Sequence, residues 1–441
     1  MSSALAENKN SAESAFFSLH KTFLEKVKPH AELLPLNRSA LGRFETLRFP
    51  DRKHEMFTFV NTKDLVTSSF SLQTENPVQS EFVRQHIYVG CEQSHLTLVD
   101  GILRPDLSDA TALGTSVKIE SLVEAAKSES VRNSLKISIE QENDVFASIN
   151  SSFMKQGIGL RVFRNKQVGV PLQILHVSTG SGNGSVMTVP RVFVHLEPLA
   201  ELKLITKYVG VKGNYFINAV QDFTVEDDAA LTYTQVQADP DDAWHFSKNR
   251  ILLKRNSRFF GCQASNGTRL VRHHSEARLS APGGELELNG VSVLVEDEQA
   301  HNFIRIHHEA DHCTSSQHFK NIINDRGRAS FDGTVIVDKG AQLTNSGQLI
   351  DNLMLSDDGR ADCKPNLMIF ADDVKCAHGA TVGQLDVNQL FYLKTRGLSE
   401  LVAKKLLTRS FAESIIQKIP FPQVVKELNN TLLKKLEADH G

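Results

Sequence analysis

A repeat of short strand-like runs is the feature of this chain that most restricts its fold. From about residue 135 to 380, apolar and polar residues alternate in short runs such as GLRVFRN, PLQILHV and RVFVHLE. Small or polar corner residues precede such runs near Ala200, Ala229, Ser257, Gly284, Ala300, Gly327 and Gly340, with gaps near 27 residues or half that value. A period in this range predicts stacked rungs, and rungs of strand and corner alone indicate a β-solenoid. A β-sandwich with regular hairpins is the alternative that the pattern leaves open.

Helical patterns flank the repeat on both sides. Residues 12–35 have helical spacing, residues 54–62 and 82–90 read as strands, and residues 116–128 read as a helix. After residue 386 the pattern is helical again, with Gly397 separating two helices, Ser399 as an N-cap and a third helix at 423–437. We therefore expect an N-terminal helical and mixed domain (1–130), a β-helix core (131–385) and a C-terminal helical domain (386–441).

Composition excludes several functional classes. The net charge is −3, the basic residues are scattered, and no run approaches 18 apolar residues, so we expect neither a nucleic-acid nor a membrane partner. The acidic, polar N-terminus lacks the regions of a signal peptide, which favours the cytoplasm. The five cysteines are widely spaced and contain no CxxC pair, which argues against a disulfide framework and against a self-contained metal site.

The run FADDVKCAHGATVGQLD (370–386) carries the clearest chemistry. Cys376 and His378 lie two residues apart, and residues at this spacing point to the same face of an extended strand. A thiol and an imidazole can both bind iron or zinc, but two ligands do not complete a tetrahedral site. A second protein chain is the simplest source of the missing ligands. The alternative is a small buried thiol and a hydrogen-bonded histidine of an ordinary core.

A second stretch, residues 301–318, is rich in histidine. On a strand, His308 and His312 would lie about 13 Å apart, which is too far for one ion. We therefore expect these histidines to pack at corners and along strands. A secondary role of His312 and Cys313 in metal or sulfur transfer is the minority hypothesis.

Several segments give the chain a family resemblance. They are HHEADHCTSSQHFK (307–320), FDGTVIVDKGAQLTNSGQ (331–348), LMLSDDGRADCKPNL (353–367), the run at 370–386 and LFYLKTRGLSE (390–400). In these segments the chain resembles the SufB/SufD family of iron–sulfur cluster assembly proteins, and the SufD branch most. The resemblance implies a mainly β fold, a right-handed parallel β-helix flanked by helical domains.

The resemblance also implies a function, that of a non-catalytic scaffold subunit. His378 and Cys376 stand on the motif positions that share a transient iron–sulfur cluster with a SufB-like chain. A SufC-like ABC-type ATPase would dock on the segment containing Phe391, Tyr392, Leu393, Arg396 and Gly397. ATP would enter only through that partner, since the glycine-rich loop STGSGNGS (178–185) is not a Walker A motif. Reduced flavin is expected only at the level of the complex.

Two other functions stay open from the residues alone. One is a β-helical carbohydrate-active enzyme that uses surface carboxylates such as Asp325, Asp332 and Asp338. The other is a structural homodimer without metal, and the chain could also form such a dimer when its partner is missing.

Overall fold

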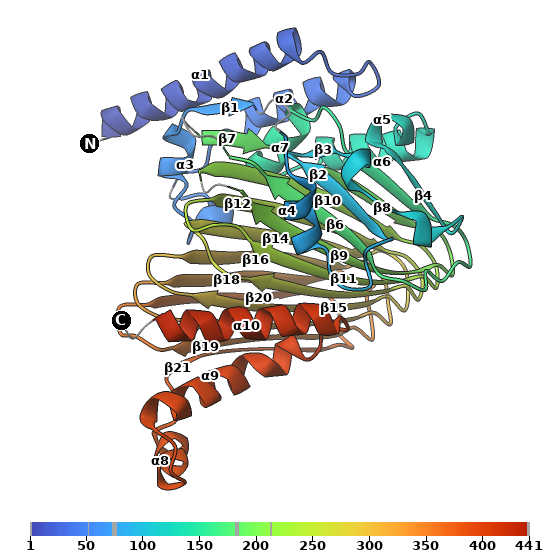
Figure 1. The fold of residues 1–441 in the computed structure, drawn as a ribbon. Coiled ribbons are helices and arrows are strands. Elements are labelled where there is room, and N and C mark those ends of the chain that lie inside the picture. The colour runs from blue at the N-terminus through green and yellow to red at the C-terminus, as the bar shows by residue number, and fades with distance from the viewer. Residues whose placement is uncertain (1, 52, 73–76, 181–184, 212–213, 439–441) are drawn as a thin grey trace.

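Parallel strands that alternate between two sheets build most of the molecule (Figure 1). The computed structural model describes residues 2–51, 53–72, 77–180, 185–211 and 214–438; most of the glycine-rich loop, residues 181–184, lies outside this set. Sheet A contains, in spatial order, β20 (Arg360–Ile369), β18 (Arg328–Val337), β16 (Gln299–His308), β14 (Leu270–Leu279), β12 (Trp244–Leu253), β10 (Tyr215–Val225), β8 (Arg191–Leu196), β5 (Ile158–Val162) and β4 (Val117–Ser121), with β7 (Ser185–Thr188) and β1 (Phe70–Leu72) beside β10. Sheet B contains β21 (Lys375–Gly383), β19 (Asn345–Met354), β17 (Thr314–Ile323), β15 (Glu285–Leu294), β13 (Arg258–Ser265), β11 (Ala230–Ala238), β9 (Glu201–Gly210), β6 (Leu172–Ser178), β2 (His95–Val99) and β3 (Ile102–Leu103).

The strand register confirms the predicted solenoid. In sheet B, Glu201 pairs with Ala230, Ala230 with Arg258 and Arg258 with Glu285, so each of these turns takes 27 to 29 residues. All of these pairings are parallel, whereas hairpins of a sandwich would be antiparallel. Each turn therefore contributes one strand to each sheet and stacks on the turn before it.

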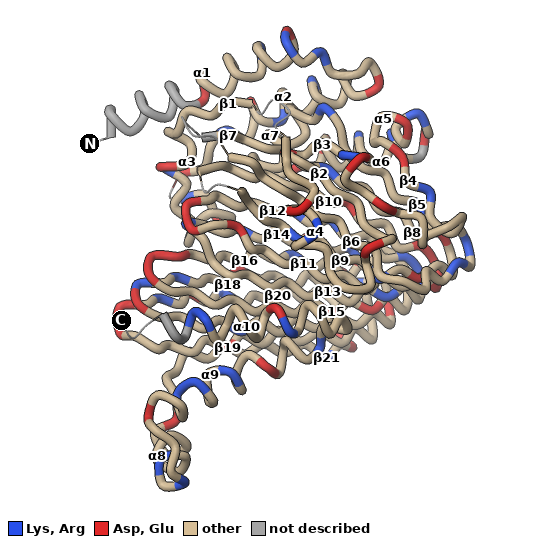
Figure 2. The backbone as a smooth tube through the Cα atoms, viewed as in Figure 1, with Lys and Arg blue, Asp and Glu red and all other residues tan. Residues whose placement is uncertain are grey.

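One corner is built in the same way in six successive turns. Two residues before each of the strands β9, β11, β13, β15, β17 and β19 stands a residue with positive φ, and we call this series the corner ladder: Leu199, Asp228, Asn256, Gly283, His312 and Leu343. The N–H of each donates to a carbonyl in the next turn, as from Asn256 to Pro282 (3.0 Å) and from His312 to Gln342 (2.9 Å). The corner ladder thus satisfies backbone groups that a sharp turn would otherwise leave unpaired. Many of the charged residues also lie at the corners of the turns (Figure 2).

Side chains that point between the two sheets fill the lumen of the solenoid. One large cluster includes Leu231 and Phe259 from sheet B and Phe223, Ile251 and Val335 from sheet A. Alternate residues of each strand enter this cluster, as the period of two requires. The lumen is therefore a packed core over most of its length.

The N-terminal elements are α1 (Ser2–Lys26), α2 (Leu34–Leu47), α3 (Lys63–Thr67), α4 (Ser80–His86), α5 (Leu122–Ala125), α6 (Glu129–Glu140) and α7 (Val145–Ser152), with 3-10 turns at Glu55–Phe57, Pro105–Leu107 and Thr111–Leu113. Most of them cover the outer face of sheet A, whereas Val83 of α4 and Leu107 pack with Leu175 and Val177 of β6 in sheet B. Aromatic side chains join the two layers, with Phe146 of α7 packing edge-on against Phe216 and Phe246. Three local predictions were wrong in this region. Residues 54–62 contain a 3-10 turn, residues 82–90 begin in α4, and residues 116–128 begin as β4.

Those errors have a common physical reason. The apolar runs concerned are short, and a short run fits either a strand or a helix until packing decides. Met56 and Phe57 are buried against sheet A, and β4 pairs antiparallel with β5. Tertiary contacts therefore override the local pattern.

The C-terminal helices are α8 (Val387–Thr395), α9 (Glu400–Ile416) and α10 (Pro422–Ala438), and the last two cover the outer face of sheet B. Ile415, Val424 and Leu428 of α9 and α10 pack on Ile205, Cys262 and Ile322 of the sheet. Figure 1 shows α10 lying across the strands and α8 projecting beyond the last turn. In the described part of the chain, no helix is both long and apolar enough to cross a membrane.

Candidate functional site at the open end

The lumen-facing side chains of the last turn, formed by β20 and β21, are not covered by another turn of the described chain. No further strand of the described chain pairs with either β20 or β21, and we call this surface the open end. Every residue of both strands is half-buried or exposed, whereas the turn before it buries alternate residues. A solenoid whose last turn lacks a cap exposes core positions and unpaired backbone groups to solvent.

Cys376 and His378 both lie on β21, at the open end. Cys376 pairs in register with Ser346 and His378 with Gln348, and both of these residues are buried in the lumen. Cys376 and His378 therefore point the same way, over the lumen, as the spacing predicted. Cys376 is half-buried against the lumen core, and His378 is exposed. The thiol and the imidazole are accessible from outside the solenoid.

The electrostatics of Cys376 favour the protonated thiol in the free chain. Burial raises the pKa of Cys376, and a backbone hydrogen bond from Ser346 offsets only part of that effect. A metal ion would favour the thiolate, because metal binding requires the deprotonated sulfur. Among the residues described, no three His, Cys, Asp or Glu side chains come together in a way that could hold a metal ion. Cys376 and His378 are thus candidate ligands, which no third such side chain of the described residues joins.

A second thiol at the open end, Cys363 of β20, was missed from the sequence. Cys363 faces the lumen from sheet A, packs against the same core and receives a hydrogen bond from Asn352 Nδ2 at 3.2 Å. The same Nδ2 donates to the carbonyl of Thr381 at 2.9 Å, so Cys363 lies near that end of β21. Thr381 is five residues beyond Cys376, roughly 16 Å along a strand. The alternation of RADCKPNLMI could have placed Cys363 inward, but not its position relative to β21.

The structure separates the members of the histidine-rich stretch. His301 hydrogen-bonds with Ser330 on the outer face of sheet A, His308 with Ser315 in the lumen, and His318 with Asp351 on the outer face of sheet B. These three histidines each have their own partner and do not converge.

His312 and Cys313 sit at one corner, but in different surroundings. His312 belongs to the corner ladder, and its side chain is exposed. Cys313 is fully buried with its Sγ 3.4 Å from the carbonyl of Ala281, and burial raises its pKa. Cys313 occupies the small buried position that follows the ladder residue in each turn, as do Ala200, Ala229 and Ser257. The structure does not bring His312 and Cys313 to one accessible surface.

The carboxylates of the enzyme alternative are also dispersed. Asp325 lies at the corner before β18 and Asp338 directly after β18, where it hydrogen-bonds with His307. Asp332, in the middle of β18, is buried under the N-terminal elements and contacts Lys364 Nζ at 3.4 Å. The three do not form the facing pair that glycoside hydrolysis needs.

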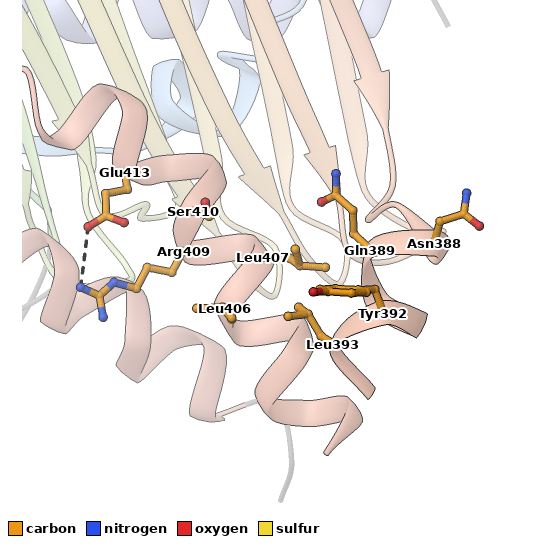
Figure 3. Close-up of a pocket in the computed structure, with 9 residues that line it drawn as sticks. All are labelled: Asn388, Gln389, Tyr392, Leu393, Leu406, Leu407, Arg409, Ser410 and Glu413. Carbon is orange, nitrogen blue, oxygen red and sulfur yellow. Dashed lines mark ion pairs between the residues drawn. The ribbon is translucent and has the colours of Figure 1, made fainter. Parts of the chain in front are cut away.

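The α8–α9 hairpin carries the second predicted interaction surface. Asp386 caps α8, Gly397 turns the chain with φ of 89°, and Ser399 caps α9 as predicted. Tyr392 and Leu393 converge with Leu406 and Leu407 on a groove of about 650 Å³ (Figure 3). Phe391, which is 69% exposed, lies outside the groove lining, as do Arg396 and Gly397. Exposed apolar side chains on two successive helices are typical of a docking surface.

The two strands of the open end differ in how readily a further strand can pair with them. Pro365 lies within β20 and has no backbone N–H to donate. This makes the edge of β20 less suited to pairing with a further strand. β21 contains no proline in KCAHGATVG, so its backbone can accept another strand along its whole length. Exposed apolar residues lie at the end of β20 and on β21, among them Met368, Ile369 and Val382. The open end is therefore suited to strand addition on sheet B.

Comparisons with known proteins identify the family to which this sequence is similar. Residues 176–411 match the family model described as SUF system FeS cluster assembly, SufBD core domain, and residues 10–174 match the SufBD protein N-terminal region. An iron–sulfur cluster assembly SufBD family protein of Synechocystis is 28% identical over 88% of each chain. The iron–sulfur cluster assembly protein SufD of Escherichia coli is 29% identical over 83% of this chain and 85% of its own. The chloroplastic protein ABCI7 of Arabidopsis thaliana is 29% identical over 90% and 85%.

Proposed function

Because the chain belongs to the SufBD family of the SUF system for iron–sulfur cluster assembly, we propose that it is a non-catalytic scaffold subunit whose open end completes a shared cluster site. The observation that carries the proposal is the uncapped last turn with Cys376 and His378 facing outward over the lumen. A SufB-like chain would pair its own strand with β21 and supply the missing ligands. The nascent cluster is the cargo of this site.

The ligand types suit a temporary site. A neutral imidazole brings one negative charge less than a thiolate, which changes the potential and the stability of a cluster. Burial raises the pKa of the Cys376 thiol, and binding to iron would require that thiol to lose its proton. We infer that such a pair releases its cargo more readily than an all-thiolate cage.

The C-terminal hairpin is the proposed docking surface for a SufC-like ATPase. The groove at Tyr392 and Leu393 would take up apolar side chains of that partner, with Phe391, Arg396 and Gly397 at its margin. α9 and α10 pack on sheet B, the sheet that ends in β21. Movement of the ATPases on binding ATP would thus reach the open end. ATP belongs to that partner, reduced flavin to the assembled complex, and the cytoplasmic location remains a prediction.

Co-purification of the His378→Ala variant with both partners tests the proposal. We expect a complex of one SufB-like chain, two ATPases and one copy of this chain that has lost most of its bound iron and sulfide. His312→Ala is the matched control, because His312 is also exposed but lies at a corner. Unchanged iron and sulfide in His378→Ala would show that the site is assigned wrongly. A stable dimer of this chain that excludes both partners would favour the structural homodimer.

A further inference from the structure

Two glutamines lie in a column directly beneath His378. Gln317 of β17 pairs in register with Gln348 of β19, and Gln348 pairs with His378 of β21. Gln317 and Gln348 are 2% and 3% exposed and face the lumen. Neighbouring strands of a sheet lie about 4.8 Å apart, so each carboxamide stacks under the next residue of the column.

Within the described chain, these two carboxamides lack hydrogen bonds in the lumen, as do both ring nitrogens of His176 in β6. Among the described residues, neither the Oε1 nor the Nε2 atom of Gln317 or Gln348 has a hydrogen-bond partner. The adjacent columns of the same strands are paired, Ser315 with Ser346 and Asn321 with Asn352, both at 2.8 Å. A buried polar group left unpaired costs about 1–3 kcal/mol, and native proteins rarely accept that cost. The unpaired glutamines therefore point to an interaction that the side-chain positions in this structure do not form.

The opposite wall of the lumen leaves room for the Gln348 carboxamide. A Cβ at Gly333 would stand 3.1 Å from Gln348 Nε2 and 2.4 Å from the ring of Phe331. Glycine at this position keeps the space into which the carboxamide extends. Side-chain rotation of Gln348 or His378 is enough to bring Oε1 to an imidazole N–H across one strand spacing. Above His378 no further turn of the described chain intervenes.

A histidine that binds a metal usually donates its other ring N–H to a neighbouring acceptor, which fixes the tautomer and the ring orientation. We propose that Gln348 is the positioning residue for His378: its Oε1 accepts the imidazole N–H that faces the lumen, and the other ring nitrogen is presented to the iron–sulfur cargo. This inference rests on the proposed function, since it assigns an orientation to the ligand that function requires.

Nitrogen NMR of the histidine rings in the isolated chain tests the orientation. The ¹⁵N signals of His378, assigned by their loss in His378→Ala, are recorded at a pH well above the usual range of imidazole titration. We expect one tautomer in the native chain, a mixture in Gln348→Met, and a single tautomer again in Gln348→Glu, which keeps an acceptor at the same place. Gln317→Met is the matched control one turn deeper and should leave the His378 signals unchanged.

Gln348→Met has nearly the same volume and removes an unpaired polar group, so we expect it to fold. Should it not fold, the comparison of Gln348→Glu with Gln348→Asn decides, because Asn is one methylene too short to reach the ring and should give the mixture. Identical His378 ring signals in the native chain and in whichever of Gln348→Met or Gln348→Asn folds would overturn the inference.

A second measurement separates this inference from the proposed function. In the assembled complex, Gln348→Met should shorten the lifetime of the bound cluster about tenfold, the lower end of the loss seen when a supporting partner of a ligand is removed. If His378→Ala keeps its iron and sulfide, the proposed function fails. If His378→Ala loses them while Gln348→Met alters neither the ring signals nor the lifetime, only the role of Gln348 fails.

Discussion

A single buried carboxylate, Asp144, joins the N-terminal elements to the solenoid. Its Oδ1 accepts from the N–H of Phe146 and so caps α7, and its Oδ2 accepts from Arg272 Nη1 at 2.5 Å. The same oxygen hydrogen-bonds with His274 Nδ1 at 2.7 Å. Burial by itself raises the pKa of Asp144, but Arg272 and His274 outweigh burial and hold that pKa well below its usual value. Asp144 is therefore charged in the folded chain.

We expect Asp144→Asn to be one of the most destabilising single changes in the chain. Removing one partner of a buried ion pair costs about 3–5 kcal/mol, because Arg272 then stays buried without a counter-charge. A depressed folded pKa stabilises the fold above the unfolded pKa of about 3.9 and loses that effect as the pH falls towards the folded value. The difference between native chain and variant in urea unfolding should thus be large at neutral pH and shrink below about pH 4.

Asp297→Asn is the control for that experiment. Asp297 forms an ion pair with Arg326 at 2.7 Å, but at an exposed corner. Its loss should shift the urea midpoint little at any pH, because solvent screens exposed pairs. Equal effects of the two variants at neutral pH would contradict the role given to Asp144.

At the scale of elements, the sequence predicts some of the corners of the solenoid but not all of them. Ala200, Ala229, Ser257 and Gly284 each follow a corner-ladder residue, as their spacing predicts. Cys313 and Thr344 fill the same position in later turns but were not recognised, because the position requires only a small side chain that tolerates burial. Ala300 lies inside β16 and Gly340 in a loop, so composition alone misplaces them.

The arrangement of the candidate site could also be predicted from the sequence only in part. The spacing of Cys376 and His378 predicts their common face, because it depends only on the geometry of one strand. Cys363 and Gln348 lie on other strands: Cys363 on β20 at the open end, and Gln348 on β19, beneath His378. Their positions follow from the register between turns, which differs from turn to turn (26 residues from β12 to β14, 32 from β18 to β20) and cannot be read from one strand.

The labelling rate of a buried cysteine should report whether α10 is docked on sheet B. Cys262 lies beneath α9 and α10, and burial raises its pKa to about 12. Val424 of α10 is fully buried in the same cluster, so Val424→Asp should detach the helix and expose the thiol. We expect a thiol reagent to label Cys262 at least about tenfold faster, as judged by mass spectrometry of its peptide.

Asn430→Asp, an exposed change on the same helix, controls for the added charge. Labelling of the half-buried Cys376 serves as the internal reference. If Cys262 in Val424→Asp reacts as slowly as in the native chain, α10 is not what shields it.

At the scale of the whole molecule, the two ends of the solenoid differ. The first turns end in the antiparallel pairs of β2 with β3 and of β4 with β5, under a layer of helices. The last turn ends in β20 and β21 without such a cover in the described chain. In stacked repeats each turn is stabilised by its neighbours, so a turn with one neighbour is the least stable. We therefore expect the last turn to unfold locally more readily than the first turns.

Hydrogen exchange should reveal this gradient. We expect the amides of β21 to exchange on the order of tenfold or more faster than those of β15, which has a neighbour on each side. Binding of the SufB-like partner should slow the exchange of β21 selectively and leave β15 unchanged. Equal protection of β15 and β21 in the free chain would contradict the proposed gradient.

The direction in which the solenoid is stacked also bears on its synthesis. Turns that emerge from the ribosome first can fold on one another while later ones are still being made, and β21 is the final strand of the stack. The surface proposed to bind a partner would thus form only after every earlier turn is in place. Association at that surface would then select complete copies of the chain over partly synthesised ones.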